Sequence, residues 1–446
     1  MAKILFVQNY YDELLGIGSI ASFIKPRHRS AVTMGCAKNI INKYRLFSPD
    51  IVGIFAVSKD HNWALGIAAK IKSIDRDSVV LLGGPHPTFY PDIIQDKSVD
   101  IICIGEGEKP VLNLLDSVDA KENYANIPSL WIKEGELIHK NKLEELLSPQ
   151  EIPVPDRALY NEFPGIRASQ EITVMASRGC PFNCYFCVNY SFNKMYGVVH
   201  YRMRKVKDVI QEIEEAKKDK KIKIVKFQDD IFGIDEKWVR EFLSQFKDRI
   251  GIPFYCLLRS EYVSEERADL LKDAGCFRVG VGIESGDTRL REEVLNKHVS
   301  DESIRRAVKI LKSKKLEFHT FNMFGFPGEE LSSAFKTLDF NIRLKPDTAY
   351  STLFQPYPGS KFFSKQVESS MLSRSFDRFK INYNYSKDSL KIQRLQKLFM
   401  LTVRFPRLRY LLPVLISLPF NGIYDMLSQA AWIIFYSNKL KRKRLK

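Results

Sequence analysis

The chain has little cysteine and no long uninterrupted apolar run. Seven cysteines among 446 residues are too few for the disulfide framework of a small secreted domain. The first residues, MAKILFVQNYY, pass from one lysine into a strand-like run, so we expect no secretory signal peptide and a reducing, cytoplasmic setting. In that setting, a tight group of cysteines indicates a metal site or a reactive thiol.

The apolar C-terminal segment, residues 407–438, is too interrupted to span a membrane. No run in it reaches the roughly 20 residues that a spanning helix needs. The interruptions are Pro413, Pro419, Asn421, Gly422 and Asp425. Six of the last eight residues, KLKRKRLK, are basic. Two interpretations stay open: peripheral attachment to the inner face of a membrane, with basic side chains at anionic headgroups, or a helical hairpin packed on the main body.

The net charge of +16, from 69 Lys and Arg against 53 Asp and Glu, is compatible with nucleic-acid binding. Much of the excess lies in the C-terminal tail, however, and the rest of the sequence has no basic-aromatic recognition pattern. We therefore expect no nucleic-acid partner.

Residues 1–135 predict a doubly wound, Rossmann-like α/β domain with a parallel sheet. Buried-type strands alternate with helical stretches, and the strands are KILFVQ, DIVGIFAV, SVVLLGG, DIICIGEG and SLWIKEG. In such sheets, ligands bind beyond the carboxyl ends of the strands. The candidate ligand-binding residues at those ends are Ser58, Gly83, Gly84, His86, Gly105 and Glu106. Paired glycines let the backbone approach a large ligand closely.

The rest of the chain predicts three further segments. Residues 136–170 are polar and then proline-spaced, which predicts a linker or strap. Residues 171–365 contain six strand-then-helix units, which predict a partial (β/α)6 TIM-type barrel with its chemistry at the carboxyl ends of the strands. The six strands are EITVMASRG, KIKIVKFQDD, IPFYCLLRS, FRVGVGIES, EFHTFNMFGF and DTAYSTLFQPY. Residues 366–446 predict a mainly helical extension.

The end of the first barrel strand carries Cys180, Cys184 and Cys187 in the spacing C-x3-C-x2-C. Structural zinc takes four protein ligands, and no second cysteine pair follows at zinc-finger spacing. A [4Fe–4S] cubane cluster bound by only three thiolates has one iron open for a ligand that is not protein. We therefore expect these cysteines to hold such a cluster.

With Phe186 directly before the last cysteine, this motif resembles the signature of radical S-adenosylmethionine (SAM) enzymes, whose partial barrel matches the six units. The resemblance implies that the open iron binds SAM. It also implies that one electron from the cluster cleaves SAM to methionine and a 5′-deoxyadenosyl radical. A reducing partner such as flavodoxin or ferredoxin would supply the electron.

The resemblance assigns roles at the second and third strand ends. Asp229 or Asp230 would contact the methionine ammonium, although both residues also fit the entry to a helix. Arg259 would meet the methionine carboxylate through charge-assisted hydrogen bonds.

At the fourth and fifth strand ends, the expected ligand groups are the nucleoside parts of SAM. Glu284 and Ser285 would address the ribose hydroxyls. The turn that contains Gly325 and Pro327 would lie against the adenine.

The N-terminal domain resembles the cobalamin (B12)-binding subfamily of these enzymes, because GGPHPT and GEGE follow its third and fourth predicted strands. The motif D-x-H-x-x-G, whose histidine ligates cobalt in proteins of the methionine synthase type, is missing from the sequence; DHNWALG has Asp60 and His61 side by side. Members of this subfamily commonly lack that histidine. His61 and His86 are candidates for contacts to the ring or tail of cobalamin.

The resemblance implies methyl transfer through cobalamin to an unactivated carbon of a biosynthetic substrate, which would be lipid-linked if the C-terminus lies on a membrane. Two other hypotheses stay open: an enzyme that catalyses a rearrangement, cyclisation or oxygenation without methylation, and a non-catalytic cobalamin or cluster sensor. A methylthiotransferase is disfavoured, since it would need a second set of cluster cysteines upstream, where the chain has only Cys36 and Cys103.

Overall fold

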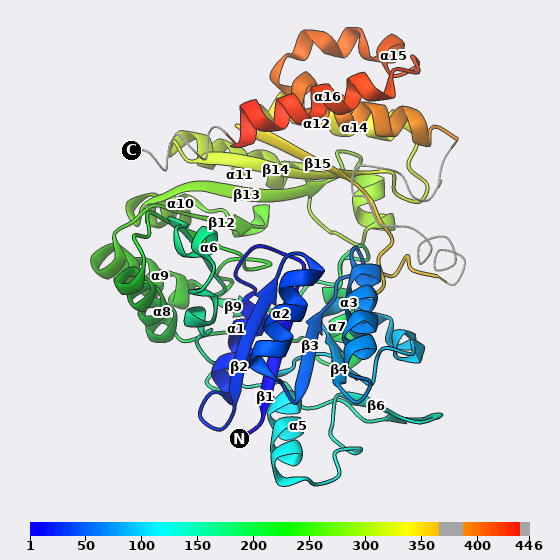
Figure 1. Ribbon diagram of the computed structural model, residues 1–446. Coiled ribbons are helices and arrows are strands. Elements are labelled where there is room, and N and C mark those ends of the chain that lie inside the picture. Colours follow the sequence, from blue (N-terminus) through cyan, green and yellow to red (C-terminus); the bar gives the residue numbers. More distant parts are fainter. Residues whose placement is uncertain (365–386, 438–446) are drawn as a thin grey trace. The chain divides into compact units, whose positions relative to one another are not determined.

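The computed structural model describes residues 1–364 and 387–437, which divide into two compact units (Figure 1). The first unit consists of Met1–Ser169, Lys194–His200 and Tyr357–Gly359. The second consists of Gln170–Asn193, Tyr201–Pro356 and the described chain from Ser360 onward. Each unit is built on its own sheet.

The first unit has a seven-stranded sheet in the order β2-β1-β3-β4-β5-β6-β7. Its strands are β1 (Lys3–Gln8), β2 (Arg29–Met34), β3 (Ile51–Phe55), β4 (Val79–Gly83), β5 (Ile101–Cys103), β6 (Leu130–Glu134) and β7 (Leu137–Lys140). The first five are parallel, in the doubly wound order 2-1-3-4-5. The helices between them are α1 (Leu15–Ile24), α2 (Ala37–Phe47), α3 (His61–Ile74), α4 (Pro85–Phe89) and α5 (Glu108–Ala120).

Two apolar clusters cover the two faces of this sheet. Ile4 and Phe6 belong to one cluster, and Leu5 and Val7 belong to the other. Because successive side chains of a strand point to opposite faces, a strand that is buried on both sides is apolar at every position. The expectation of a Rossmann-like domain is therefore confirmed.

The end of this sheet differs from the prediction. The sequence favoured a parallel sheet throughout, but β6 pairs antiparallel with β5, and β7 pairs antiparallel with β6. Gly135, with φ +61°, supplies the tight turn between β6 and β7. The predicted linker 136–170 therefore contains a strand, and its 3-10 turn (Arg157–Tyr160) and helix α6 (Pro164–Arg167) pack Tyr160 and Ile166 into the core of the first unit.

The second unit has a six-stranded parallel sheet in the order β15-β14-β13-β12-β11-β8. Its strands are β8 (Glu171–Val174), β11 (Ile224–Phe227), β12 (Phe254–Leu258), β13 (Cys276–Glu284), β14 (Glu317–Phe324) and β15 (Thr348–Leu353). Five of them lie within a predicted strand, and β13 begins one residue before its predicted strand, at Cys276. Neighbours in sequence are neighbours in the sheet. This is the expected partial (β/α)6 barrel, open between β8 and β15.

Helices follow the strands of the second unit in sequence. They are α7 (Asn189–Tyr196), whose last three residues belong to the first unit, α8 (Val206–Asp219), α9 (Glu236–Gln245), α10 (Glu265–Asp273), α11 (Asp301–Ser313) and α12 (Leu331–Leu344). A short antiparallel pair consists of β9 (Ser177–Arg178) and β10 (Arg202–Met203). One large apolar cluster contains side chains from β8 and β11–β13 and from α8, α9, α10 and α11.

The described part of the C-terminal extension is helical, as expected. It consists of α14 (Ser389–Arg404), the 3-10 turn η6 (Pro406–Tyr410), α15 (Leu412–Leu415), α16 (Asn421–Trp432) and the π-helical turn η7 (Ile433–Ser437). Ile392, Leu395 and Phe399 of α14 pack with Leu338 of α12 and Leu353 of β15. No helix within residues 1–364 and 387–437 is long and apolar enough to cross a membrane. The rest of the predicted helical stretch and the basic tail lie outside the described residues.

Candidate active site

The three cysteines lie on the loop that follows β9 and leads into α7, at one edge of the six-stranded sheet. All three are free thiols; Cys180 and Cys184 are buried, and Cys187 is half-buried. The loop also folds on itself, because the backbone N–H of Cys187 donates to the carbonyl oxygen of Cys184 at 3.0 Å.

Each cysteine sulfur has its own N–H donor. The backbone N–H of Phe182 donates to Cys180, and both the backbone and the side-chain amide of Asn189 donate to Cys187, with an Nδ2–Sγ distance of 3.5 Å. Arg259 approaches Cys184 at an Nη1–Sγ distance of 4.0 Å. Such donors stabilise thiolates, and hydrogen bonds to the sulfurs tune bound iron–sulfur clusters.

Burial opposes ionisation of these thiols when no metal is bound. It raises the pKa of Cys180 to about 11 and that of Cys187 to about 12, and it also raises the pKa of Cys184. The positive charges of Lys297 and Arg259 act in the opposite direction on Cys184. A bound metal deprotonates its thiol ligands, so the site favours occupied over free thiolates.

Neighbouring loops fix the cysteine loop from two sides. The backbone N–H of Tyr185 donates to the carbonyl oxygen of Leu295 at 2.9 Å, and the N–H of Lys361 donates to that of Tyr185 at 2.9 Å. Phe186 packs against Leu295 and Phe326. The loops after β13 and β15 therefore hold the segment that carries the cysteines.

The two aspartates after β11 have different surroundings. Asp229 is fully buried, and its Oδ1 accepts hydrogen bonds from the backbone N–H and hydroxyl of Ser177 at 2.6 and 2.5 Å. Burial raises the pKa of Asp229 to about 6, and its Oδ2 is a buried oxygen without a hydrogen-bond partner among the described residues. Asp230 has an exposed side chain that accepts a hydrogen bond from Asn189, a donor to Cys187.

Arg259 connects the third strand end to the cysteine loop. Its guanidinium lies over the ring of Phe182, 3.6 Å from the centroid, and its Nη2 pairs with Glu261 at 2.7 Å. With Cys184 on another side, this cation stands within the cysteine site and is largely buried.

Glu284 ends β13 in a left-handed conformation, with φ +65°. Its Oε1 accepts a hydrogen bond from Lys297 Nζ at 2.8 Å, and the same ammonium donates to the carbonyl oxygen of Gly282 at 2.8 Å. Both side chains are nearly buried. A left-handed glutamate is strained, so the pairing with Lys297 contributes to holding it there.

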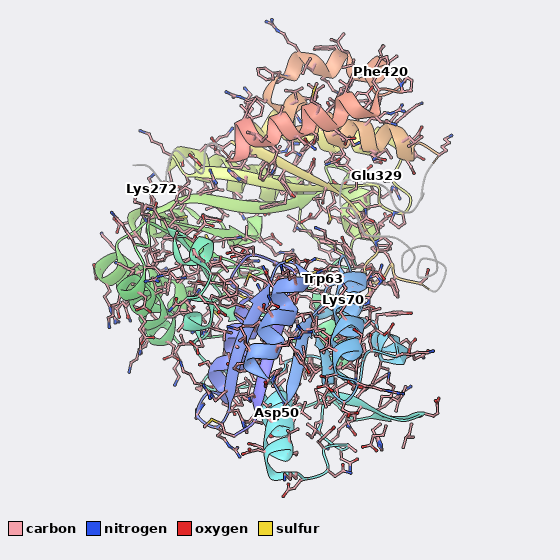
Figure 2. All side chains as sticks on the ribbon, in the orientation of Figure 1. Asp50, Trp63, Lys70, Lys272, Glu329 and Phe420 are labelled. Atoms are coloured by element: carbon pink, nitrogen blue, oxygen red, sulfur yellow. The ribbon has the colours of Figure 1, made fainter. Side chains whose placement is uncertain are left out.

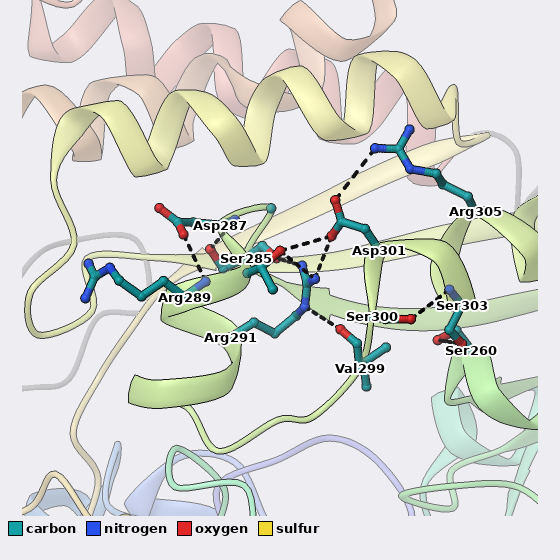
Figure 3. A network of polar contacts seen from close by, with 12 residues as sticks. Ser260, Ser285, Asp287, Arg289, Arg291, Val299, Ser300, Asp301, Ser303 and Arg305 are labelled. Carbon is teal, nitrogen blue, oxygen red and sulfur yellow. Dashed lines mark hydrogen bonds and ion pairs between the residues drawn. The ribbon is translucent and has the colours of Figure 1, made fainter.

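The turn after Glu284 is held by a buried polar network (Figure 3). Arg291 is fully buried and donates to the carbonyl oxygens of Ser285 at 2.7 Å and Val299 at 2.8 Å, and to Asp301 at 2.6 Å. The hydroxyl of Ser285 accepts from the backbone N–H of Asp287 at 3.1 Å. Ser285 thus has a partner inside the turn, and its predicted contact to ribose stays a prediction.

The turn after β14 contains Gly325 and Pro327, and it is closed by Glu329 (Figure 2). Glu329 Oε2 accepts hydrogen bonds from the backbone N–H groups of Gly325 and Phe326. Gly325 needs a φ of +84°, which glycine adopts at little cost. Burial raises the pKa of Glu329 to about 8, and its Oε1 is buried without a partner among the described residues.

In the first unit, Ser58 and His86 meet at the carboxyl ends of β3 and β4. His86 Nδ1 lies 3.0 Å from the Ser58 hydroxyl, and the His86 ring stacks on His61 with centroids 4.6 Å apart. Burial and the neighbouring His61 lower the pKa of His86 to about 3, so its imidazole is neutral. Its Nε2 is buried and has no hydrogen-bond partner in the described chain.

The three predicted glycines of this unit differ in how closely other atoms approach them. Gly84 has φ +102°, and a Cβ there would meet the Ala56 carbonyl oxygen at 2.9 Å, so packing requires it. Gly105, with φ +84°, is packed under the hydroxyl of Tyr196, and Glu106 beside it is half-buried. Gly83 differs, since a Cβ there would have only Leu81 within 4 Å.

The sequence does not indicate several residues of the site. Lys297, Arg291 and Asn189 lie in loops or at helix starts, where no periodicity or spacing indicates a role. Glu329 follows the predicted Gly325–Pro327 turn in sequence, but its burial depends on the turn that folds back over it.

The residues fit the cofactors suggested by the motifs. For a cluster, the donor set is three free thiols, each with an N–H donor. Within the described chain, no group of three or more His, Cys, Asp and Glu side chains is arranged for a single metal ion; a cluster differs, because each thiolate binds its own iron. For cobalamin, the unpartnered His86 Nε2 and the open side of Gly83 lie at the ligand-binding edge of a doubly wound sheet.

Comparison with known proteins agrees with this geometry. The family model of the Radical SAM superfamily matches residues 174–340, and the B12 binding domain model matches residues 15–115. An uncharacterized methyltransferase of Pyrococcus horikoshii is 30% identical over 373 residues, which are 80% of this chain and 79% of that protein. The anaerobic magnesium-protoporphyrin IX monomethyl ester cyclase of Rubrivivax gelatinosus is 26% identical over 343 residues, or 72% and 59% of the two chains.

Among solved structures, the radical SAM methyltransferase TsrM from Kitasatospora setae shares the fold, with a TM-score of 0.67 at 16% identity over 81% of this chain and 75% of that one. The chain belongs to the radical SAM superfamily, as a cobalamin-dependent enzyme of the methyltransferase type whose cofactors are a [4Fe–4S] cluster, SAM and cobalamin.

Proposed function

We propose that the enzyme transfers a methyl group, by way of cobalamin, to an unactivated carbon of a biosynthetic small molecule. The observation that carries the proposal is the set of three free cysteine sulfurs at one edge of the six-stranded parallel sheet, each with its own N–H donor. When bound, the cluster would supply one electron, one SAM molecule a methyl group, and a second SAM molecule a 5′-deoxyadenosyl radical. Cobalamin would carry the methyl group. A radical suits a carbon with neither a nucleophilic lone pair nor an acidic proton.

In this proposal, Cys180, Cys184 and Cys187 hold three irons of the cluster. The backbone N–H of Phe182 stabilises the thiolate of Cys180, and the amides of Asn189 stabilise that of Cys187. Arg259 adds a positive charge beside Cys184, which favours the thiolate and the reduced, more negative form of the cluster.

The SAM contacts follow the same strand ends. Asp230 presents a carboxylate to the methionine ammonium, while buried Asp229 positions Ser177 at the start of the cysteine loop. Arg259 is proposed for the methionine carboxylate. Glu284 has one oxygen on Lys297, and its other oxygen is proposed for the ribose hydroxyls. The Gly325–Pro327 turn, closed by Glu329, gives a flat backbone surface for the adenine.

The first unit is proposed to hold cobalamin at the ends of β3, β4 and β5. Ser58 orients His86, and the neutral His86 Nε2 is proposed as a hydrogen-bond acceptor or donor toward the ring or tail of the corrinoid. Gly83, Gly105 and Glu106 would complete this edge.

A lipid-linked small molecule is proposed because the C-terminal extension of the barrel unit exposes apolar side chains. The likeness to a cyclase favours a second candidate, radical cyclisation without methyl transfer. A reducing partner such as flavodoxin or ferredoxin would feed either reaction.

Labelled SAM separates the candidates. The anaerobically purified enzyme is incubated with SAM that carries a trideuterated methyl group and with a chemical reductant, and the corrinoid is then analysed by mass spectrometry. Methylation predicts trideuteromethyl-cobalamin, formed without substrate. Its absence from enzyme that contains both the cluster and cobalamin would contradict methylation and favour the non-methylating candidate.

A further inference from the structure

Exposed apolar side chains are concentrated at the C-terminal end of the described chain. Of 18 exposed large apolar residues, ten lie between Phe405 and Ile434, while the other eight are scattered from Met1 to Leu390. The apolar patch, as we define it, consists of Tyr410, Leu411, Val414, Phe420, Ile423 and Met426. Single exposed apolar residues are normal on a protein surface, but a group of this size within one short segment indicates an interaction surface.

Two helices that are hydrogen-bonded to each other contribute to the patch. The hydroxyl of Tyr424 on α16 donates to the carbonyl oxygen of Leu418 at 3.0 Å and to that of Leu415, at the end of α15. Phe420 lies in the segment between the two helices, directly before α16 (Figure 2).

The helices that expose the patch also contribute side chains to a buried core. Their opposite side buries Leu412, Ile416 and Tyr424 against α14 and, through it, against β15. A surface helix of a globular protein normally has one apolar stripe, which faces its core. This hairpin has a second apolar side, and no described residue covers it.

The positive charge of residues 389–437 indicates an anionic lipid surface as the partner of the patch. Residues 389–437 contain six lysines and arginines and a single acid, Asp425, which pairs with Lys397 at 2.6 Å. Arg404 and Arg407 flank the patch with exposed side chains and form no ion pair with any described residue. Apolar side chains bordered by cations are the pattern of segments that lie in the interface of an anionic bilayer.

The shape of the segment agrees with lying on a membrane rather than crossing it. η6, α15 and α16 contain 5, 4 and 12 residues; Pro406 is the first residue of η6 and Pro413 the second of α15. Tyr410 and Trp432 are exposed near the ends of the segment, and such rings favour the level of the headgroups.

We propose that η6, α15 and α16 form a membrane-surface anchor, in which the apolar patch enters the outer part of an anionic lipid layer while Arg404 and Arg407 meet the lipid phosphates. This surface lies on the barrel unit, whose strand β15 supports α14. The anchor would bring the barrel to substrates that reside in a membrane. Its action requires neither methyl transfer nor a bound cofactor, so the two proposals can fail separately.

Vesicle flotation of the full-length enzyme tests the anchor. Vesicles of phosphatidylcholine alone are compared with vesicles that also contain phosphatidylglycerol. We expect the enzyme to float with the anionic vesicles, to bind them less at high salt, and to partition into neutral vesicles at least about tenfold more weakly. The emission of Trp432 should shift to the blue on binding, and Trp432→Phe should remove that shift.

Two matched variants distinguish the patch from exposed apolar residues elsewhere on the protein. The patch variant combines Leu411→Ser, Val414→Ser, Phe420→Ser and Ile423→Ser. The control variant combines Leu46→Ser, Leu137→Ser, Val198→Ser and Val199→Ser, which replace equally exposed residues elsewhere. We expect the patch variant to lose about tenfold or more in partitioning, with an unchanged melting temperature, and the control to bind like the parent enzyme.

Three outcomes would overturn the anchor. The first is a parent enzyme that stays in the vesicle-free fraction, and the second is a patch variant that floats as well as the control. The third is self-association of the parent in solution that the patch variant abolishes, together with no vesicle binding, which would assign the patch to a protein interface.

Discussion

Lys297 pairs with Glu284 across the fourth strand end of the barrel, with 2.8 Å between Nζ and Oε1, and both side chains are almost buried. Glu284 has a φ of +65°, a conformation that costs about 1 kcal/mol or more for a residue other than glycine. The salt bridge therefore joins a strained strand end to the loop that also supports the cysteine segment through Leu295.

Replacing Lys297 by Met should destabilise the enzyme strongly. The change leaves a carboxylate in a nearly buried position without its partner, and breaking one side of a buried pair costs about 3–5 kcal/mol. Denaturant unfolding of the cofactor-loaded enzyme measures the loss. The double variant Lys297→Met with Glu284→Gln should recover at least about 1 kcal/mol, because it removes the uncompensated charge. Additive effects of the two changes would show that the pair is not coupled.

The buried carboxyl of Glu329 should make stability fall as the pH rises. Its pKa is about 8 in the folded protein, above the ordinary value of 4.5, so the folded state binds the proton more tightly. The resulting stabilisation is complete below about pH 4.5 and is lost as the pH rises through about 8. Glu329→Gln retains an acceptor for the N–H groups of Gly325 and Phe326 and cannot ionise.

The free energy of unfolding, measured at pH 6 and pH 8.5 for the parent and Glu329→Gln, isolates this effect. The difference between the two proteins should change by a few kcal/mol in favour of the glutamine variant at the higher pH. An equal pH dependence in both would mean that Glu329 is ionised throughout.

His86→Phe should weaken cobalamin binding without unfolding the first unit. Phenylalanine retains an aromatic ring to stack on His61 but removes the Nε2 that has no protein partner, together with the Nδ1 contact to Ser58. Loss of one hydrogen bond to the cofactor predicts an increase of about tenfold in the dissociation constant. Corrinoid content per chain and a titration of the cofactor-free enzyme with hydroxocobalamin measure it. Unchanged affinity would place His86 among the packing residues.

The sequence predicted those parts of the fold that repeat. All six barrel strands were identified, because each is a short apolar run followed by a helical stretch. Strand β2 was missed since it is an edge strand that begins with the exposed Arg29. The antiparallel β6–β7 hairpin was also missed, because β7 is short and exposes Leu137 and Lys140.

The sequence predicts those parts of the candidate site whose residues lie close together in the chain. The spacing of Cys180, Cys184 and Cys187 indicates a cluster without any knowledge of the fold. Lys297 could not be found in this way, because its partner Glu284 lies 13 residues away across a loop. The same holds for Arg291, whose carbonyl partners become neighbours only when the turn after β13 has folded.

The most direct test of the account is the formation of 5′-deoxyadenosine. The enzyme is reconstituted anaerobically with iron and sulfide, reduced with dithionite and incubated with SAM, and the product is quantified by mass spectrometry. Cys184→Ala is compared with Cys276→Ala, which removes a buried cysteine of the barrel core. The account predicts 5′-deoxyadenosine from the parent and from Cys276→Ala, and none above background from Cys184→Ala. Equal amounts from the parent and Cys184→Ala, or none from a parent that carries the cluster, would contradict it.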